Sequence, residues 1–310
     1  MKRILLLLAL WLTMAERAFC GYLEDGNAMY SKGDYDGAIV NFTKAIEQDQ
    51  NNYVAYAFRG YMRQIKGDLD NALADYNKAI EINPKYALAY SNRGNVKRAK
   101  HDLSGALDDF TKAIELKPDY ADAYFNRALA EKSKNDFDGT IADYTKAIEF
   151  KPDYADAYYN RGNAKTSKGD LDGAIVDYTK VLELKPDYAK AYSNRGWNEF
   201  VKTNFDSAIS DETRAIHLNP KDANAYSTRG WSLYEKGNVA GALEDCKKAV
   251  ELEGANSLDA AADQGMIDFM NGDYENAIAE WEKFIQHDAS VKPLLQPWIE
   301  KAKAKQNVAK

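Results

Sequence analysis

Apolar residues recur along most of the chain with the spacing of an amphipathic helix. Ala106, Leu107, Phe110, Ala113 and Ile114, for example, fall at positions i, i+1, i+4, i+7 and i+8. Side chains with this spacing share one face of an α-helix. Polar and charged residues fill the positions between them, so each segment is expected to bury one face and expose the other. The pattern predicts an all-α protein.

The same pattern returns every 34 residues. Five of the seven prolines are spaced in this way, namely Pro84, Pro118, Pro152, Pro186 and Pro220. Copies begin near residues 19, 53, 87, 121, 155, 189, 223 and 258, the last of them shifted by one residue. Each copy reads as two helices. The first is predicted to end at a residue that tolerates the left-handed conformation: Gly33, Gly67, Asn135, Gly169 or Gly237. One such hairpin cannot bury its own apolar face, so the copies are predicted to stack as a solenoid.

Fixed places within the copies carry recurring residues. The fourth place is Tyr56, Tyr90, Tyr124, Tyr158, Tyr192 and Tyr226, and the eighth is Gly60, Gly94, Gly162, Gly196 and Gly230. The twentieth is Ala38, Ala72, Ala106, Ala174, Ala208, Ala242 and Ala277. Over residues 21–289 this pattern resembles the tetratricopeptide repeat (TPR) family. The resemblance implies a right-handed solenoid of about eight helix hairpins. Residues 290–310, with Leu295 and Trp298 on one side, are then expected to form a C-terminal capping helix and a basic tail.

The seventh and the twenty-third places of the copies hold charged residues. The family usually has Leu at the seventh place. Here that place holds Arg59, Arg93, Arg127, Arg161, Arg195 and Arg229. The twenty-third place, on the second helix, holds Asp75, Asp109, Asp143, Asp177, Asp211 and Asp245. In an antiparallel hairpin the two places lie at matching heights. We predict six partly buried Arg–Asp pairs, whose even repetition indicates a role in the scaffold.

The sixth place suggests a binding function. It holds Asn92, Asn126, Asn160 and Asn194 in four consecutive copies. A carboxamide can both donate hydrogen bonds to a peptide unit and accept them from it. The row is similar to one in the repeat domain of O-GlcNAc transferases, where Asn side chains along the concave groove hold an extended peptide. The alternative is local hydrogen bonding between neighbouring repeats.

Aromatic residues appear at the ninth and twelfth places of the copies that begin near residues 189 and 223. The ninth place becomes Trp197 and Trp231, and the twelfth becomes Phe200 and Tyr234. Residues at i and i+3 share a helix face. Because the cluster is not repeated in earlier copies, we interpret it as a set of binding anchors that point into solvent. The alternative is packing against a neighbouring copy or a dimer partner.

The first twenty residues resemble a targeting segment. Lys2 and Arg3 precede an apolar run over residues 4–12, which is too short to span a membrane of ~30 Å. We expect a signal peptide over residues 1–20, with cleavage after Ala15 or after Cys20, and export to the periplasm or the medium. A lipid anchor at Cys20 and an uncleaved N-terminal anchor are the alternatives. No integral span is expected after cleavage.

Charge and composition argue against several functions. The net charge is -7, whereas a nucleic-acid-binding protein needs a basic excess. The three histidines, His101, His217 and His287, have no spacing that suits a metal site. No phosphate-binding loop or dinucleotide fingerprint occurs. We therefore expect no catalytic residues, metal or cofactor.

These features together indicate a non-catalytic scaffold or adaptor. Its groove is expected to bind an extended peptide or a partner protein through the Asn row and the aromatic cluster. A carbohydrate-binding helper in envelope polysaccharide export or cell-wall turnover is the alternative, because aromatic side chains also stack on sugar rings. Self-association through the repeat edges, giving a homo-oligomer, is a third reading.

Overall fold

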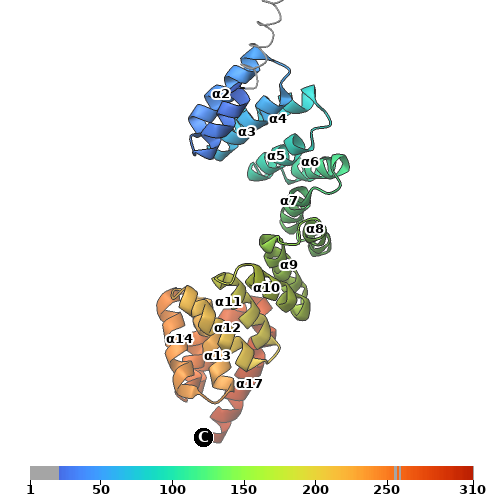
Figure 1. Cartoon of the computed structure of the whole chain (residues 1–310). Coiled ribbons are helices and arrows are strands. Elements are labelled where there is room, and N and C mark those ends of the chain that lie inside the picture. Colours follow the sequence, from blue (N-terminus) through green and yellow to red (C-terminus); the bar gives the residue numbers. More distant parts are fainter. Residues whose placement is uncertain (1–20, 255–256, 258–259, 310) are drawn as a thin grey trace, which may run out of the picture. The chain divides into compact units, whose positions relative to one another are not determined.

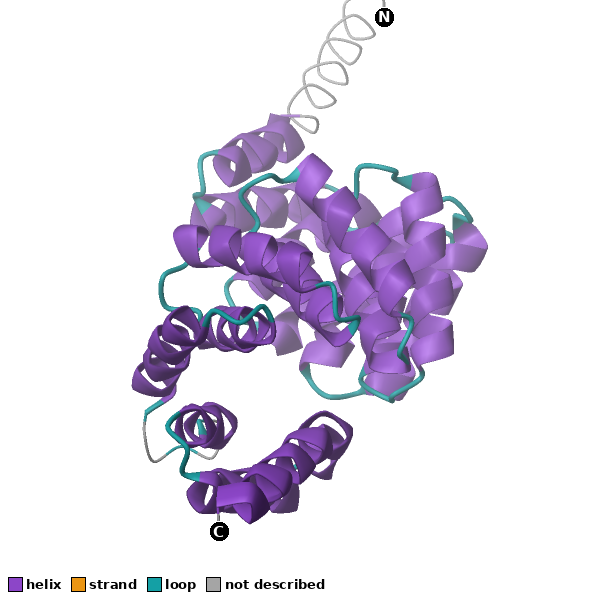
Figure 2. Ribbon diagram, turned by 90° about the horizontal axis from the view of Figure 1, so that it is seen from below, coloured by secondary structure: helices purple, strands orange, loops and turns teal. Residues whose placement is uncertain are grey.

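Helices make up all the regular secondary structure of residues 21–254, 257 and 260–309, the part of the chain that the computed structural model describes (Figure 2). Residues 21–31 are helical. The helices that follow are α2 (Tyr35–Gln48), α3 (Tyr53–Ile65), α4 (Leu69–Ile82), α5 (Ala87–Ala99), α6 (Leu103–Leu116), α7 (Ala121–Lys132), α8 (Phe137–Phe150), α9 (Ala155–Lys168), α10 (Leu171–Leu184), α11 (Ala189–Val201), α12 (Phe205–Leu218), α13 (Ala223–Glu235), α14 (Val239–Glu253), α15 (Ala261–Met270), α16 (Tyr274–His287), the short 3₁₀ helix η1 (Ala289–Val291) and α17 (Lys292–Ala309). The predicted all-α fold is confirmed. Residues 1–20, on which the expected signal peptide rests, lie outside the described part.

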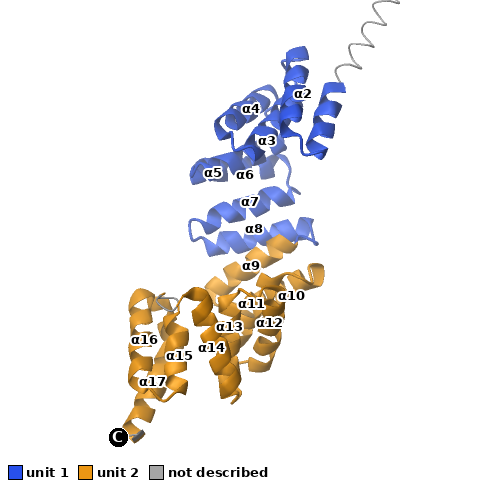
Figure 3. Cartoon of the chain, turned by 90° about the vertical axis from the view of Figure 1, so that its left-hand side faces the viewer, with its two compact units in different colours: residues 1–154 blue, residues 155–310 orange. Residues whose placement is uncertain are grey.

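Consecutive helices pack as antiparallel pairs, beginning with residues 21–31 and α2 and ending with α15 and α16. The described residues thus form eight pairs, after which α17 packs against α16. The chain divides into two compact units, residues 1–154 and residues 155–310 (Figures 1 and 3). Unit 1 ends after α8, and unit 2 contains α9 to α17. Within the described residues, no helix is long and apolar enough to cross a membrane.

A recurring short turn joins the two helices of a pair. Its left-handed residue is usually glycine, as at Gly67 (φ 80°), and Asn135 takes the same conformation (φ 60°). The next residue is usually an aspartate that caps the second helix, and it is an asparagine at Asn204 and Asn238. The side chain of Asp136, for example, accepts a hydrogen bond from the backbone N–H of Gly139 at 3.0 Å. An N-cap oxygen satisfies one of the free N–H groups at a helix start. The predicted positions of the first-helix ends are confirmed.

Small residues allow the two helices of a pair to approach closely. Ala106 is fully buried, and so is the ring of Phe110, four residues further along α6. That ring lies against Gly94 of α5, where an added Cβ atom would come within 2.7 Å of it. The glycine at the eighth place therefore makes room for the aromatic residue at the twenty-fourth. This contact forms the core of an ordinary repeat.

The six predicted Arg–Asp pairs are all present as bidentate pairs. In α5, Arg93 donates from Nε to Asp109 Oδ2 at 2.8 Å and from Nη2 to Oδ1 at 2.6 Å. Its Nη1 reaches Asn77 of the preceding pair at 2.8 Å, and its guanidinium lies 5.4 Å from the ring centre of Tyr90. The corresponding pairs are Arg59–Asp75, Arg127–Asp143, Arg161–Asp177, Arg195–Asp211 and Arg229–Asp245. The arginine links the two helices of its own pair, and in this copy it also reaches the preceding pair.

Candidate functional site

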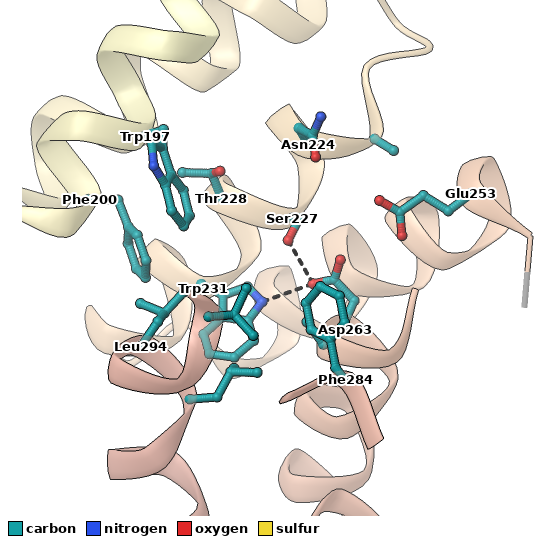
Figure 4. Close-up of a pocket in the computed structure, with 14 residues that line it drawn as sticks. Trp197, Phe200, Asn224, Ser227, Thr228, Trp231, Glu253, Asp263, Phe284 and Leu294 are labelled. Carbon is teal, nitrogen blue, oxygen red and sulfur yellow. Dashed lines mark hydrogen bonds between the residues drawn. The ribbon is translucent and has the colours of Figure 1, made fainter. Parts of the chain in front are cut away.

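Unit 2 contains a hollow of about 600 Å³ near its C-terminal end. Side chains of α11, α13, α15, α16 and α17 line most of it, together with Glu253 of α14 and Val291 of η1. A second hollow of about 640 Å³ adjoins the first and extends toward α9. The two share the lining residues Trp197, Ala223, Asn224, Ser227 and Thr228. We call the two adjoining hollows the unit 2 groove, and the first of them the C-terminal pocket (Figure 4).

Trp197 stands where the two hollows meet. Its side chain remains 38% exposed, although the ring centre of Phe200, one helical turn further along α11, lies only 5.7 Å away. Phe200 itself is 7% exposed and faces the C-terminal pocket. Leu294 of α17 lies on the same side of the pocket (Figure 4). The exposed indole and the apolar wall below it form a surface on which a ligand can pack without displacing protein side chains.

Trp231 and Tyr234 lie deeper than the sequence suggested. Trp231 is 4% exposed, and its ring packs edge-on against Trp298 of α17 at 5.3 Å between ring centres. Tyr234 packs against the same Trp298 ring at 5.4 Å. The expectation that the aromatic cluster points into solvent is therefore wrong for Trp231 and Phe200, because the following repeat and α17 cover this stripe. Trp231 contributes a wall of the pocket and is also part of the hydrophobic core.

The four asparagines are divided between the two units. Asn92 and Asn126 lie half-buried in unit 1, whereas Asn160 and Asn194 belong to unit 2. Asn194 lines the second hollow, where its amide donates to Asn163 Oδ1 at 2.8 Å and to the Tyr159 hydroxyl at 3.1 Å. The Asn160 amide donates to the backbone oxygen of Asp156 at 2.8 Å. At both unit 2 positions, amide hydrogen atoms that a ligand would use take part in local hydrogen bonds.

Asp263 is a pocket residue that the sequence analysis did not single out. Its side chain is 2% exposed and lines the C-terminal pocket. Its Oδ1 accepts hydrogen bonds from Ser227 Oγ and Trp231 Nε1, both at 2.9 Å (Figure 4). Burial raises the pKa of Asp263 to about 6, although these donors favour the carboxylate. The signal was present in the repeat register: counted from the shifted start at residue 258, Asp263 occupies the sixth place, in line with Asn194.

The two parts of the groove differ in charge. Asp263 and Glu253 are the charged residues that line the C-terminal pocket, whereas Lys190, Lys221 and Asp222 line the second hollow. The described residues contain no group of three or more His, Cys, Asp or Glu side chains arranged to hold a metal ion. The groove thus combines an apolar wall, a carboxylate pocket and a mixed polar region. Such a surface is suited to binding a chain that carries different side chains along its length.

Family comparisons match most of the repeat region. The family described as "Tetratricopeptide repeat" matches residues 155–188 and 193–260. The family described as "TPR repeat" matches residues 60–98, 94–132 and 128–165. No curated protein matches the chain at a significant level.

Solved structures give a similar result. The crystal structure of YrrB, described as "a TPR protein with an unusual peptide-binding site", is 26% identical to this chain. The match covers 63% of this chain and 97% of YrrB, with a TM-score of 0.53. PilF of Pseudomonas aeruginosa is 17% identical, with 68% and 96% of the two chains covered and a TM-score of 0.62. A tetratricopeptide repeat protein from Parabacteroides merdae is 19% identical, with 82% and 99% covered and a TM-score of 0.54. The last two similarities concern the fold alone.

Proposed function

The chain belongs to the tetratricopeptide repeat family, and from this membership we propose that it is a non-catalytic scaffold that binds an extended peptide or a peptide segment of a partner protein. The binding surface is the unit 2 groove. The observation that carries the proposal is the exposed ring of Trp197 at the junction of the two hollows. Large aromatic side chains beside a pocket are typical anchors of protein interfaces.

Two further observations support this proposal. The second hollow, which Trp197 also lines, offers the exposed carboxamide of Asn224. An extended backbone needs hydrogen-bond partners of this kind along its path. In addition, YrrB, whose fold resembles that of this chain, is described as having a peptide-binding site.

A peptide library tests the proposal before any partner is identified. Immobilised nonapeptides of random sequence are incubated with the wild-type protein and with Trp197→Ala. Val176→Ala is the matched control, because Val176 is 67% exposed on α10 and does not line the groove. We expect peptides that retain the wild type and the control but release Trp197→Ala. If the library yields no binder, or only binders indifferent to Trp197, the groove proposal is wrong.

We also propose that the protein acts outside the cytosol. Support comes from the basic start and short apolar run of residues 1–20. Cell fractionation with N-terminal sequencing tests this: recovery of the mature protein without Met1 in an exported fraction is expected. Intact protein with Met1 in the cytosol would contradict the proposal.

A further inference from the structure

The carboxylate of Asp263 differs from the other buried aspartates of the molecule. Asp75, Asp109, Asp143, Asp177, Asp211 and Asp245 are also buried, and each pairs with the arginine of its own repeat. Asp263 is as deeply buried, but no Lys or Arg among the described residues pairs with it. Hydrogen bonds from Ser227 and Trp231 hold its Oδ1 without supplying a positive charge. A buried carboxylate is favoured when a cation lies beside it.

A cation that pairs with Asp263 would reach it from the unit 2 groove. The side chain lines the C-terminal pocket, which is connected through Trp197 and Ser227 to the rest of the unit 2 groove. Glu253, on α14, lines the same pocket, and none of the lining residues in the described part of the chain is Lys or Arg. A positive group that enters the pocket from the groove would therefore meet two acidic side chains and no lining cation.

The apolar part of the pocket lining suits a long apolar stem. Trp197, Phe200, Phe284 and Leu294 form much of the lining, so most of the contact available to an entering side chain is apolar. Lysine and arginine pack their methylene groups on apolar surface while the charged head reaches a polar partner. The exposed face of an indole also attracts a cation within ~6 Å.

We infer that the C-terminal pocket receives an arginine or lysine side chain of the bound segment, with its charged head at Asp263 and its stem against Trp197 and Leu294. This inference rests on the proposed peptide-binding function and adds a sequence preference to it. An acidic side chain would be repelled by Asp263 and Glu253. A purely apolar side chain would exclude water from Asp263 without compensating its charge.

The peptide library also tests this preference. Peptides that bind the wild-type protein in a Trp197-dependent manner are sequenced, and one binder is resynthesised with each basic residue replaced in turn by a neutral isostere, citrulline for arginine or norleucine for lysine. Affinities are measured by fluorescence anisotropy against the wild type, Asp263→Asn and Asp268→Asn. In Asp263→Asn the new amide oxygen can still accept from Ser227 and Trp231, so the variant is expected to fold. Asp268, on the same helix but outside the pocket, is the matched control.

We expect enrichment of Lys or Arg at one position of the binders. Replacing that residue, or introducing Asp263→Asn, should weaken binding by about ten- to a hundred-fold, the range of one charge-assisted hydrogen bond, and the two changes together should cost little more than either alone. Asp268→Asn should bind as the wild type does. Trp197-dependent binders without a basic preference, or with affinity unchanged by Asp263→Asn, would overturn the inference and leave the proposed function intact. Absence of any binder would overturn both.

Discussion

At the scale of single residues, the Arg–Asp pairs replace an apolar contact by a charged one, and their surroundings differ from copy to copy. Asp109 has a second cation, because Lys97 Nζ lies 2.9 Å from it. At the equivalent position near Asp143 the chain has Glu131, and burial, together with the charge of Asp143, raises the pKa of Glu131 to about 7. Arg127 is therefore the main positive charge for two acidic groups.

This difference predicts unequal costs for the same substitution. Arg127→Ala leaves Asp143 without its cation next to Glu131, and we expect a loss of about 3–5 kcal/mol in the free energy of unfolding at pH 7. Arg93→Ala should cost less, because Lys97 still pairs with Asp109. Urea unfolding followed by circular dichroism measures both. Equal losses would show that the exchange of Lys97 for Glu131 at this position does not matter to these pairs.

Glu212 is a second acidic residue in an unusual environment. It occupies the place of the core aromatic in its repeat, is fully buried, and fits against Gly196. Burial, with Asp222 and Asp211 nearby, raises the pKa of Glu212 to about 10. The folded state therefore keeps a proton that the unfolded state releases above pH ~4.3, so stability falls as pH rises from there toward 10.

The Glu212→Gln variant removes this titration while preserving the shape of the side chain. We expect the melting temperature of this variant to decrease less than that of the wild type between pH 5 and pH 9. At the alkaline end the variant should be the more stable protein. Glu183→Gln, on the exposed face of α10, is the control that should leave the slope unchanged. A Glu212→Gln protein with the wild-type pH dependence would refute the buried, protonated carboxyl.

The sequence alone predicted the Arg–Asp pairs, but it did not predict the burial of Trp231 or the role of Asp263. The Arg–Asp pairs were predictable because helix-hairpin geometry places the seventh and twenty-third places side by side. The burial of Trp231 was not, because it depends on α17 and the following repeat packing over a stripe that is otherwise exposed. The role of Asp263 was not predictable either, because it depends on the hydrogen bonds that this residue of α15 accepts from Ser227 and Trp231 of α13.

At the scale of elements, α17 is the helix whose role differs most from its neighbours. Leu295, Trp298, Ile299 and Ala302 bury one side of it against the last pair. Its outer side carries Lys301, whose ammonium lies 4.3 Å from the centre of the Trp298 ring. The helix covers apolar surface that would otherwise be exposed at the end of the array.

Deletion of residues 290–310 should therefore lower stability and promote association. The truncation exposes the rings of Trp231 and Trp281, which pack close to Trp298 in the intact protein. Exposed apolar patches of this kind favour self-association. Thermal melts and light scattering measure the two effects. A truncated protein that stays monomeric with an unchanged midpoint would contradict a capping role for α17.

At the scale of the whole molecule, the chain divides into two compact units although the 34-residue period is even, and the candidate site lies in the second unit. The sequence repeats without a break across residue 154, yet the chain forms two compact units, 1–154 and 155–310. The unit 2 groove lies where the repeats depart from their own pattern, at Trp197 and Asp263. The regular positions predict the fold, and the irregular ones locate the candidate site.

The central claim, that the unit 2 groove binds an extended segment, is tested most directly by Trp197→Ala. A library-selected peptide is titrated against the wild type, Trp197→Ala and Val176→Ala, beside a thermal melt of each. We expect Trp197→Ala to lose at least about thirtyfold in affinity, corresponding to an anchor of ~2 kcal/mol. Its melting temperature should fall by less than ~4 °C, because the ring is partly exposed. Unchanged affinity with a large drop in melting temperature would place Trp197 in the scaffold and contradict the claim.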